Sequence, residues 1–207
     1  MSADEGMRVR QMEWLHVLAV LVLLWPMTLQ GQAPVSITVE SSSMQEGQSM
    51  PAEYTADGRN ISPGLKWRGA PAAARELAII VTNEDHVWAV PSPVPFMQWV
   101  VYGIKPTVTE LAEGMPTMEI LSAPADLAGA FQAHTAFDVT GYRGPQPPVG
   151  QTHRYRFRVL ALDKAIDLPP GAPASDVWKA IQGHIIGEGS LLVPYARVPK
   201  PAKKPVV

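Results

Sequence analysis

The chain has 207 residues, of which 46% are hydrophobic and 17% charged, so it is long enough for one domain with a sizeable core. Its formal net charge of -2 leaves no broad basic surface for a nucleic-acid backbone, so nucleic acid is not an expected partner. The absence of cysteine excludes disulfides, thiolate metal sites, cysteine nucleophiles and cysteine-linked lipid anchors.

The first 33 residues have the pattern of an export signal. Two arginines precede an apolar run over residues 14–25, and small residues up to Ala33 follow at the spacing of a signal-peptidase site. A permanent membrane span is the alternative, but Pro26 and Gln30 leave the run shorter than the roughly 18 to 20 apolar residues that cross a bilayer. We therefore expect residues 1–33 to be a cleaved signal peptide and the mature protein to be secreted or periplasmic.

Short apolar and alternating runs predict a mostly β domain over residues 34–198. Residues 36–40 alternate as a half-buried strand does. Residues 77–81 are almost wholly apolar and rich in β-branched side chains, which is typical of a central strand buried on both faces. After a proline-rich loop at 90–95, residues 97–104 predict another strand with little exposed surface.

The remaining segments give weaker patterns. Residues 107–140 show only weak apolar spacing and predict connecting loops. One helix is expected from Asp176 to Ile186, with Ser175 as its N-cap. The tail at 199–207 is rich in lysine and proline, so it is expected to be a solvated extension.

The most distinctive stretch is GYRGPQPPVGQTHRYRFRVLALD, at residues 141–163. The glycines and prolines of residues 141–148 exclude a helix or an interior strand, so a rigid loop is expected. From His153 onward the chain reads as a strand, in which His153 and Tyr155 point to one face and the alternating arginines point to the other. A histidine and a tyrosine therefore face the same way, directly after a stiff loop that could form the wall of a cavity.

This combination resembles the phosphatidylethanolamine-binding protein family, also called Raf-kinase-inhibitor-like proteins, and in particular its bacterial branch. The family's G-Y-x-G-P-x-P-P loop and the H-R-Y that follows it match residues 141–148 and 153–155. Residues 54–67 and 183–195 are similar to two further family segments, so the resemblance covers about residues 36–197. It implies a Greek-key β-sandwich of two sheets with a few peripheral helices.

The resemblance also implies a small pocket for phosphate-like anions, with the loop at 141–148 as its wall. The family's D-P-D-x-P loop corresponds to residues 83–87, where Asn83 replaces the leading aspartate, and Gln98 replaces a histidine of the next strand. Neither amide titrates, but both can still form hydrogen bonds with a polar ligand. Binding of a dianion is expected to weaken by about 1 to 3 kcal/mol if one charge-assisted hydrogen bond is lost. The predicted ligand-binding residues are Asn83, Asp85, Gln98, Tyr142, Gly144, Pro145, His153 and Tyr155.

Structural interpretations of several residues stay open. Tyr155 could be a core aromatic whose hydroxyl is bound to the backbone, and Asp85 could only stabilise its own loop. His86 has no family counterpart and is expected to be exposed, whereas His184 is expected to pack against the sheet from the predicted helix. No histidine pair has metal-ligand spacing, so we expect no metal and no cofactor.

The expected function is non-catalytic binding of a small polar or anionic ligand, such as phosphate or a phospholipid head group. One alternative is a phosphoester or ester hydrolase with His153 as base, oriented by Asp85 or Glu84. Another, also suggested by the resemblance, is an inhibitor that binds an extracellular protease or kinase. Among the predicted pocket residues only His153 can change from neutral to cationic near neutral pH, so anion binding is expected to be stronger at about pH 5.5 than at about pH 8.

Overall fold

The computed structural model describes residues 33–199, which form a mostly β domain. Residues 1–32 of the predicted signal peptide (1–33) and residues 200–207 of the predicted tail (199–207) lie outside the described residues. The strands are β1 (Val35–Ser36), β2 (Thr38–Glu40), β3 (Leu65–Arg68), β4 (Glu76–Asn83), β5 (Phe96–Ile104), β6 (Glu110–Leu111), β7 (Phe131–Gln132), β8 (Thr152–Leu162) and β9 (Ile185–Ala196). The described part of the chain also contains one α-helix, α2 (Ala174–Ile181), and a short 3-10 helix, η1 (Ala52–Tyr54).

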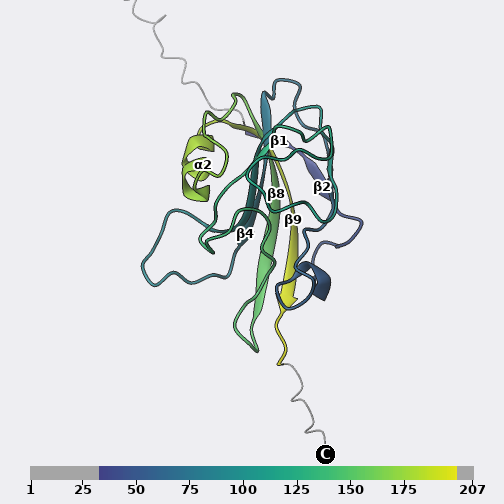
Figure 1. Ribbon diagram of the computed structural model, residues 1–207, viewed down its shortest axis with the longest axis vertical. Coiled ribbons are helices and arrows are strands. Elements are labelled where there is room, and N and C mark those ends of the chain that lie inside the picture. Colours follow the sequence, from purple (N-terminus) through teal and green to yellow (C-terminus); the bar gives the residue numbers. More distant parts are fainter. Residues whose placement is uncertain (1–32, 200–207) are drawn as a thin grey trace, which may run out of the picture. The chain divides into compact units, whose positions relative to one another are not determined.

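The strands form two sheets, as predicted. The large sheet has six strands in the order β1, β9, β8, β4, β5, β7, and the small sheet has three in the order β2, β3, β6. In Figure 1, α2 lies on one side of the long strands β4, β8 and β9, and β2 lies on the other. The prediction of a mostly β domain with two sheets is confirmed, and its peripheral helices are α2 and η1 among the described residues.

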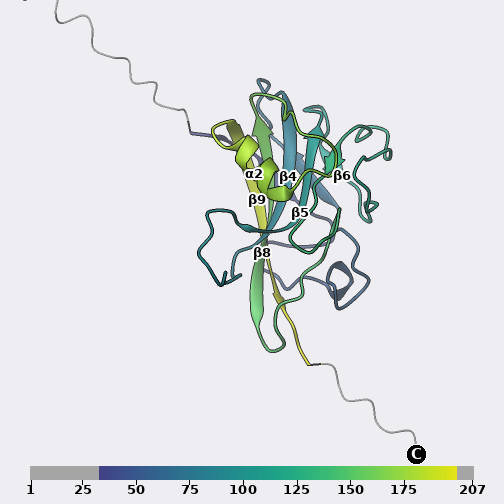
Figure 2. The same cartoon turned by 60° about the vertical axis from the view of Figure 1, so that its left-hand side comes forward.

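Strand β4 is central, because it pairs antiparallel with both β5 and β8. Residues 77–81 are fully buried, which confirms the prediction of a strand covered on both faces. Leu77, Ile79 and Val81 pack into the core on the side of the small sheet, while Ala78 and Ile80 belong to the core beneath α2. Figure 2 shows α2 lying across the large sheet. The large sheet therefore has an inner face toward the small sheet and an outer face toward α2.

The helix is shorter than predicted. Its N-cap is Pro173 and no side chain caps it, so the predicted capping role of Ser175 is wrong. Gly183 has a φ of 80°, a conformation that glycine adopts without steric cost, and Ile185 already belongs to β9. His184 is therefore not on the helix. Its Nδ1 lies 2.9 Å from Oδ1 of Asp163, in the connection into β9.

Residues 36–40 form parts of two strands rather than one. β1 pairs parallel with β9 at the edge of the large sheet, and β2 pairs antiparallel with β3 in the small sheet. Ile37, between them, is buried and donates its backbone N–H to the carbonyl oxygen of Glu188 at 2.9 Å. The chain passes close to Gly189 here, where a Cβ would lie 1.9 Å from the Ile37 carbonyl oxygen. Because the chain passes so close to β9, residues 35–40 contribute one strand to each of the two sheets.

Residues 107–140 are mostly connecting segments, as predicted, apart from the two-residue strands β6 and β7. They nevertheless contribute to the core, because Val108, Leu111, Leu121 and Leu127 are buried. Among the described residues, neither helix has the length and the apolar composition that a membrane span requires.

Candidate functional site

The loop at residues 141–148 is anchored from inside the domain by Tyr142. The ring of Tyr142 is buried edge-on to Trp99, with 5.3 Å between the ring centroids. Its hydroxyl donates a 2.6 Å hydrogen bond to the carbonyl oxygen of Tyr54. Burial, with the neighbouring tyrosine hydroxyls, raises the pKa of Tyr142 far above its usual value, so it stays a neutral donor. Tyr142 therefore fixes the loop that was predicted to form the wall of the site.

Gly144 and Pro145 hold the next part of the loop through their backbone. The N–H of Gly144 donates to Oδ1 of Asn60 at 2.7 Å, and the carbonyl oxygen of Pro145 accepts from the N–H of Ala56 at 3.0 Å. A Cβ at Gly144 would lie 2.3 Å from the carbonyl oxygen of Tyr54. The wall is thus pressed against the segment after η1, and only glycine fits at this contact.

His153 lies beside the end of β4, where two amides hold its ring. Its Nδ1 is 3.0 Å from Nδ2 of Asn83, and its Nε2 is 3.1 Å from Oε1 of Gln151. Oδ1 of Asn83 accepts from the N–H of Asp85 at 3.1 Å, which leaves Nδ2 of Asn83 as the donor to the ring. Nδ1 of His153 therefore accepts and Nε2 donates, so the neighbouring amides determine the tautomer.

Neither of the two carboxylates proposed as a partner of His153 contacts its ring. Asp85 accepts the backbone N–H of Arg154 at 2.7 Å and its Nη2 at 2.6 Å. Glu84 lies near Arg156 and Arg158, at 3.2 and 3.5 Å. Burial pushes the pKa of Glu84 up, but the Thr82 hydroxyl and the two guanidinium groups outweigh it and lower that pKa. The carboxylate geometry that the hydrolase alternative requires is therefore not found among the described residues.

The ion pair between Asp85 and Arg154 predicts an acid-sensitive contribution to stability. Hydrogen bonds from Arg154 lower the pKa of Asp85 to about 2. Because the folded-state pKa lies below the ordinary value, the stabilisation is present above about pH 4 and is lost as the pH falls toward 2. Arg154 is 57% exposed, so we expect a contribution below about 1 kcal/mol. Urea unfolding between pH 2 and 5 should show a flatter pH dependence for Asp85→Asn than for wild type.

The control for this experiment is Asp126→Asn. The Asp126 side chain is exposed and forms no ion pair with the described residues, so this variant should follow the wild-type curve. Identical curves for wild type and Asp85→Asn would contradict the assignment of Asp85 as a charged partner of Arg154.

Two buried polar atoms of the site have no hydrogen-bond partner within the described protein. They are Oε1 of Gln98 and the hydroxyl of Tyr155, whose residues are 2% and 0% exposed. Tyr155 lies directly across from Asn83 in the sheet, and Gln98 lies on β5 where its pairing with β4 shifts register. Burial, and then the charge of Asp85, raise the pKa of Tyr155 well above its usual value, so the hydroxyl remains a donor. The alternative in which this hydroxyl is bound to the backbone is not what the structure shows.

An aromatic cluster, which we call the rim, lies next to Asn83. His86 is half-buried rather than exposed as predicted, because its ring stacks on Phe96 with 3.8 Å between centroids. Phe96 meets Phe137 edge-on at 5.1 Å, and the guanidinium carbon of Arg143 lies 4.6 Å above the Phe137 ring. Burial and the nearby His153 lower the pKa of His86. Local sequence patterns missed the rim, since its members come from three separate loops or strand ends.

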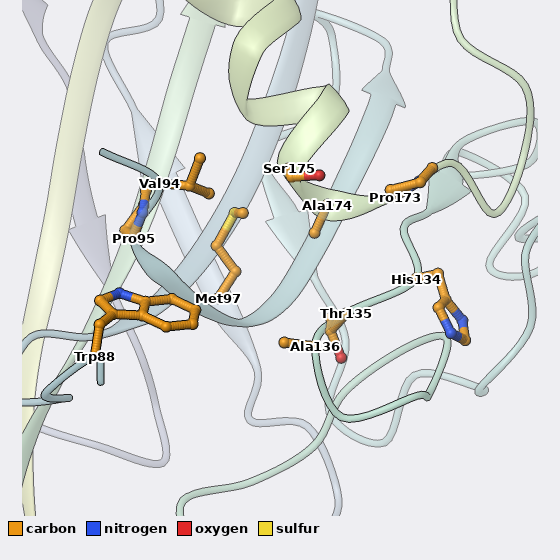
Figure 3. A pocket seen from close by; sticks show the side chains of 10 residues that line it. All are labelled: Trp88, Val94, Pro95, Met97, His134, Thr135, Ala136, Pro173, Ala174 and Ser175. Carbon is orange, nitrogen blue, oxygen red and sulfur yellow. The ribbon is translucent and has the colours of Figure 1, made fainter. Parts of the chain in front are cut away.

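Two cavities lie along the side of α2. One of 350 Å³ is bordered by Asn83, His86 and Trp178, and one of 230 Å³ by Trp88, Met97 and their neighbours. Figure 3 shows the second cavity, with Trp88, Val94, Pro95 and Met97 on one side and Pro173, Ala174, Ser175, His134, Thr135 and Ala136 around the other. Gln98, His153 and Tyr155 line neither cavity. Among the described residues there is also no group of three or more histidines and carboxylates that could hold a metal ion.

The structure thus defines a two-sheet β protein with a glycine- and proline-rich loop, a histidine at a strand start and a buried tyrosine two residues further on. The family model described as phosphatidylethanolamine-binding protein matches residues 40–196, so the chain belongs to this family. It is 39% identical over 161 residues to a UPF0098 protein of Methanothermobacter thermautotrophicus, which covers 78% of this chain and 99% of the relative.

Solved structures agree with this assignment. The crystal structure of Escherichia coli YbcL, described as a new member of the mammalian family, matches with a TM-score of 0.67 and 25% identity, over 77% of this chain and 98% of that one. A homologue of the family from Chlamydia trachomatis matches with a TM-score of 0.64 and 29% identity, over 80% of this chain and 99% of that one. The predicted family and fold are thus confirmed.

Proposed function

We propose that this protein is an exported, non-catalytic binding protein whose site takes a small polar or anionic head group, such as phosphate or the head group of a phospholipid. The observation that carries the proposal is the pair of buried, unpartnered polar atoms, Oε1 of Gln98 and the hydroxyl of Tyr155. Export rests on the apolar pattern of residues 14–25 and the small residues that follow it.

The two atoms have complementary hydrogen-bonding roles. A buried polar atom without a partner costs about 1 to 3 kcal/mol, so a ligand that pairs with both atoms recovers this cost on binding. The Tyr155 hydroxyl can donate to an oxygen of the ligand, and Oε1 of Gln98 can accept from a hydroxyl or ammonium group. A phosphate monoester that retains a proton, or phosphoethanolamine, offers both kinds of group.

The surroundings of His153 favour binding over catalysis. A general base needs a free ring nitrogen and usually a carboxylate that orients the ring, but both nitrogens of His153 lie next to amide groups of Asn83 and Gln151. The hydrolase alternative would be supported by turnover of phosphoesters or esters that is lost in His153→Ala. No contact of the described residues favours the protease- or kinase-inhibitor alternative.

Two tyrosine variants test the proposal, because they remove hydroxyls in different environments. Tyr155→Phe removes the unpartnered hydroxyl, so we expect phosphoethanolamine binding to weaken by about tenfold with little loss of stability. Tyr142→Phe removes a donor to the Tyr54 carbonyl, so we expect a loss of about 1 kcal/mol of stability and unchanged binding. Calorimetric titration with phosphate, phosphoethanolamine and acetate, together with urea unfolding, measures both quantities.

The titrations are repeated at about pH 5.5 and about pH 8 on wild type and His153→Ala. Stronger anion binding at the lower pH in wild type alone would tie recognition to the charge of His153. Equal binding in wild type and Tyr155→Phe, or no binding at millimolar ligand, would contradict the proposed site.

A further inference from the structure

A polar cavity of 330 Å³ lies beside the loop at Tyr142 and Arg143. Of the eight predicted site residues only Tyr142 lines it, so it is distinct from the site around Gln98 and Tyr155. Its volume falls in the lower part of the range of small-molecule pockets. The lining residues are Asn60, Thr117, Val139, Thr140, Tyr142 and Arg143.

The lining contains one cation and no carboxylate. Arg143 is held by two contacts: its guanidinium carbon lies 4.6 Å above the Phe137 ring, and its Nη2 donates to Oε1 of Gln146 at 3.0 Å. Its Nε is buried and has no hydrogen-bond partner in the part of the chain that the structure describes. Within residues 33–199 Arg143 forms no ion pair, so its charge is balanced by no carboxylate there. A positioned guanidinium with an unused N–H is suited to an oxyanion.

The neutral lining groups add hydrogen-bond donors. Oδ1 of Asn60 already accepts the N–H of Gly144 at 2.7 Å, which leaves the amide NH₂ of Asn60 as its free donor. Thr117 also lines the cavity, and the hydroxyl of Thr140 lies 3.3 Å from Nδ1 of His134. Hydroxyl groups can also donate to an anion.

We infer that this cavity is a second binding site, for a small oxyanion such as a carboxylate or a phosphate, with Arg143 as its charged anchor. The inference rests on three observations: the buried unpartnered Nε of Arg143, the lining without carboxylates, and the fixed amide of Asn60. It does not depend on the site around Gln98 and Tyr155.

The test is an NMR titration of the ¹⁵N-labelled full chain with inorganic phosphate and, separately, with acetate. We expect saturable shifts of the Arg143 Nε–Hε signal and of the Thr117 and Thr140 amides. Arg143→Gln should weaken binding at this cavity by about tenfold or more, because it removes a charge-assisted hydrogen bond. Arg143→Lys should weaken binding by about threefold, because lysine keeps the positive charge but lacks the planar guanidinium group that can form two parallel hydrogen bonds. The ratio of the phosphate and acetate affinities shows which oxyanion the cavity prefers.

Two variants serve as controls, and a third provides a second test. Arg75→Gln removes an exposed cation outside the cavity and should leave the shifts unchanged. Tyr155→Phe should also leave them unchanged, which separates this cavity from the other site. Thr117→Val removes the hydroxyl of a lining residue at nearly constant volume and carries the test if Arg143→Gln does not fold. Wild-type affinity in both Arg143→Gln and Thr117→Val, or shifts confined to residues around His153, would overturn the inference.

Discussion

Replacing Gly144 by alanine is expected to lower the free energy of unfolding by about 3 kcal/mol. A Cβ at this position would lie 2.3 Å from the carbonyl oxygen of Tyr54 and 2.8 Å from Cα of Thr55. Both are backbone atoms, which cannot rotate away as the end of a flexible side chain can. The loop wall would have to move, which would also strain the hydrogen bond from the Gly144 N–H to Asn60. Urea unfolding measures the loss.

Gly64→Ala is the matched control. The atoms nearest to a Cβ at Gly64 lie 3.5 Å away, an ordinary van der Waals distance, and Gly64 has no positive φ that would strain alanine. We expect this variant to change stability by less than about 1 kcal/mol in either direction. Similar losses for Gly64→Ala and Gly144→Ala would mean that the contact between the wall and the Tyr54 segment is softer than the geometry indicates.

The double variant Asn83→Asp with Gln98→His is expected to bind phosphate about tenfold or more tightly than wild type at about pH 6. A carboxylate at position 83 would lie beside Nδ1 of His153, now 3.0 Å from the Asn83 amide, and would favour the charged ring. Its second oxygen could still accept the N–H of Asp85. A histidine at position 98 would add a second group that can carry positive charge to the proposed site. Calorimetric titration with phosphate measures the gain.

The control combines Asn83→Asp with Gln48→His, which places the new histidine on an exposed part of the chain. It should show only the part of the gain that comes from position 83. If the first double variant binds phosphate no more tightly than wild type, the assignment of these residues to one anion-binding pocket is wrong.

Contiguous patterns were sufficient to predict the central strand and to recognise the family resemblance, which in turn implied the two-sheet β fold. The loop at residues 141–148 and the following His153 and Tyr155 lie close together in the sequence. Strand geometry alone predicts that these two side chains point to the same face of the sheet. Residues 77–81 were predictable because burial on both faces requires an uninterrupted apolar run. The cleavage of residues 1–33 as a signal peptide stays a prediction.

The helix shows where local patterns were insufficient. Ile185 continues the apolar spacing of the helix, so periodicity extended the prediction past the residue where the chain turns. The helix ends at Ile181 because Gly183 takes a positive φ and the following residues pair with β8. Pairing with a distant strand outweighed the local helix propensity. A short sequence window does not include the partner strand, so it cannot predict this outcome.

The polar chemistry of the site was decided only by the tertiary structure. The family resemblance implies that Asp85 and Tyr155 lie in one pocket. It does not show that the Asp85 carboxylate is paired with Arg154, or that the Tyr155 hydroxyl and Oε1 of Gln98 have no hydrogen-bond partner among the described residues. The rim residue Phe137 reaches Phe96 and Arg143 from a segment with no distinctive pattern. Residue type determines which groups can donate, accept or carry charge, whereas their pairing depends on which distant segments the fold brings within about 3 Å of each other.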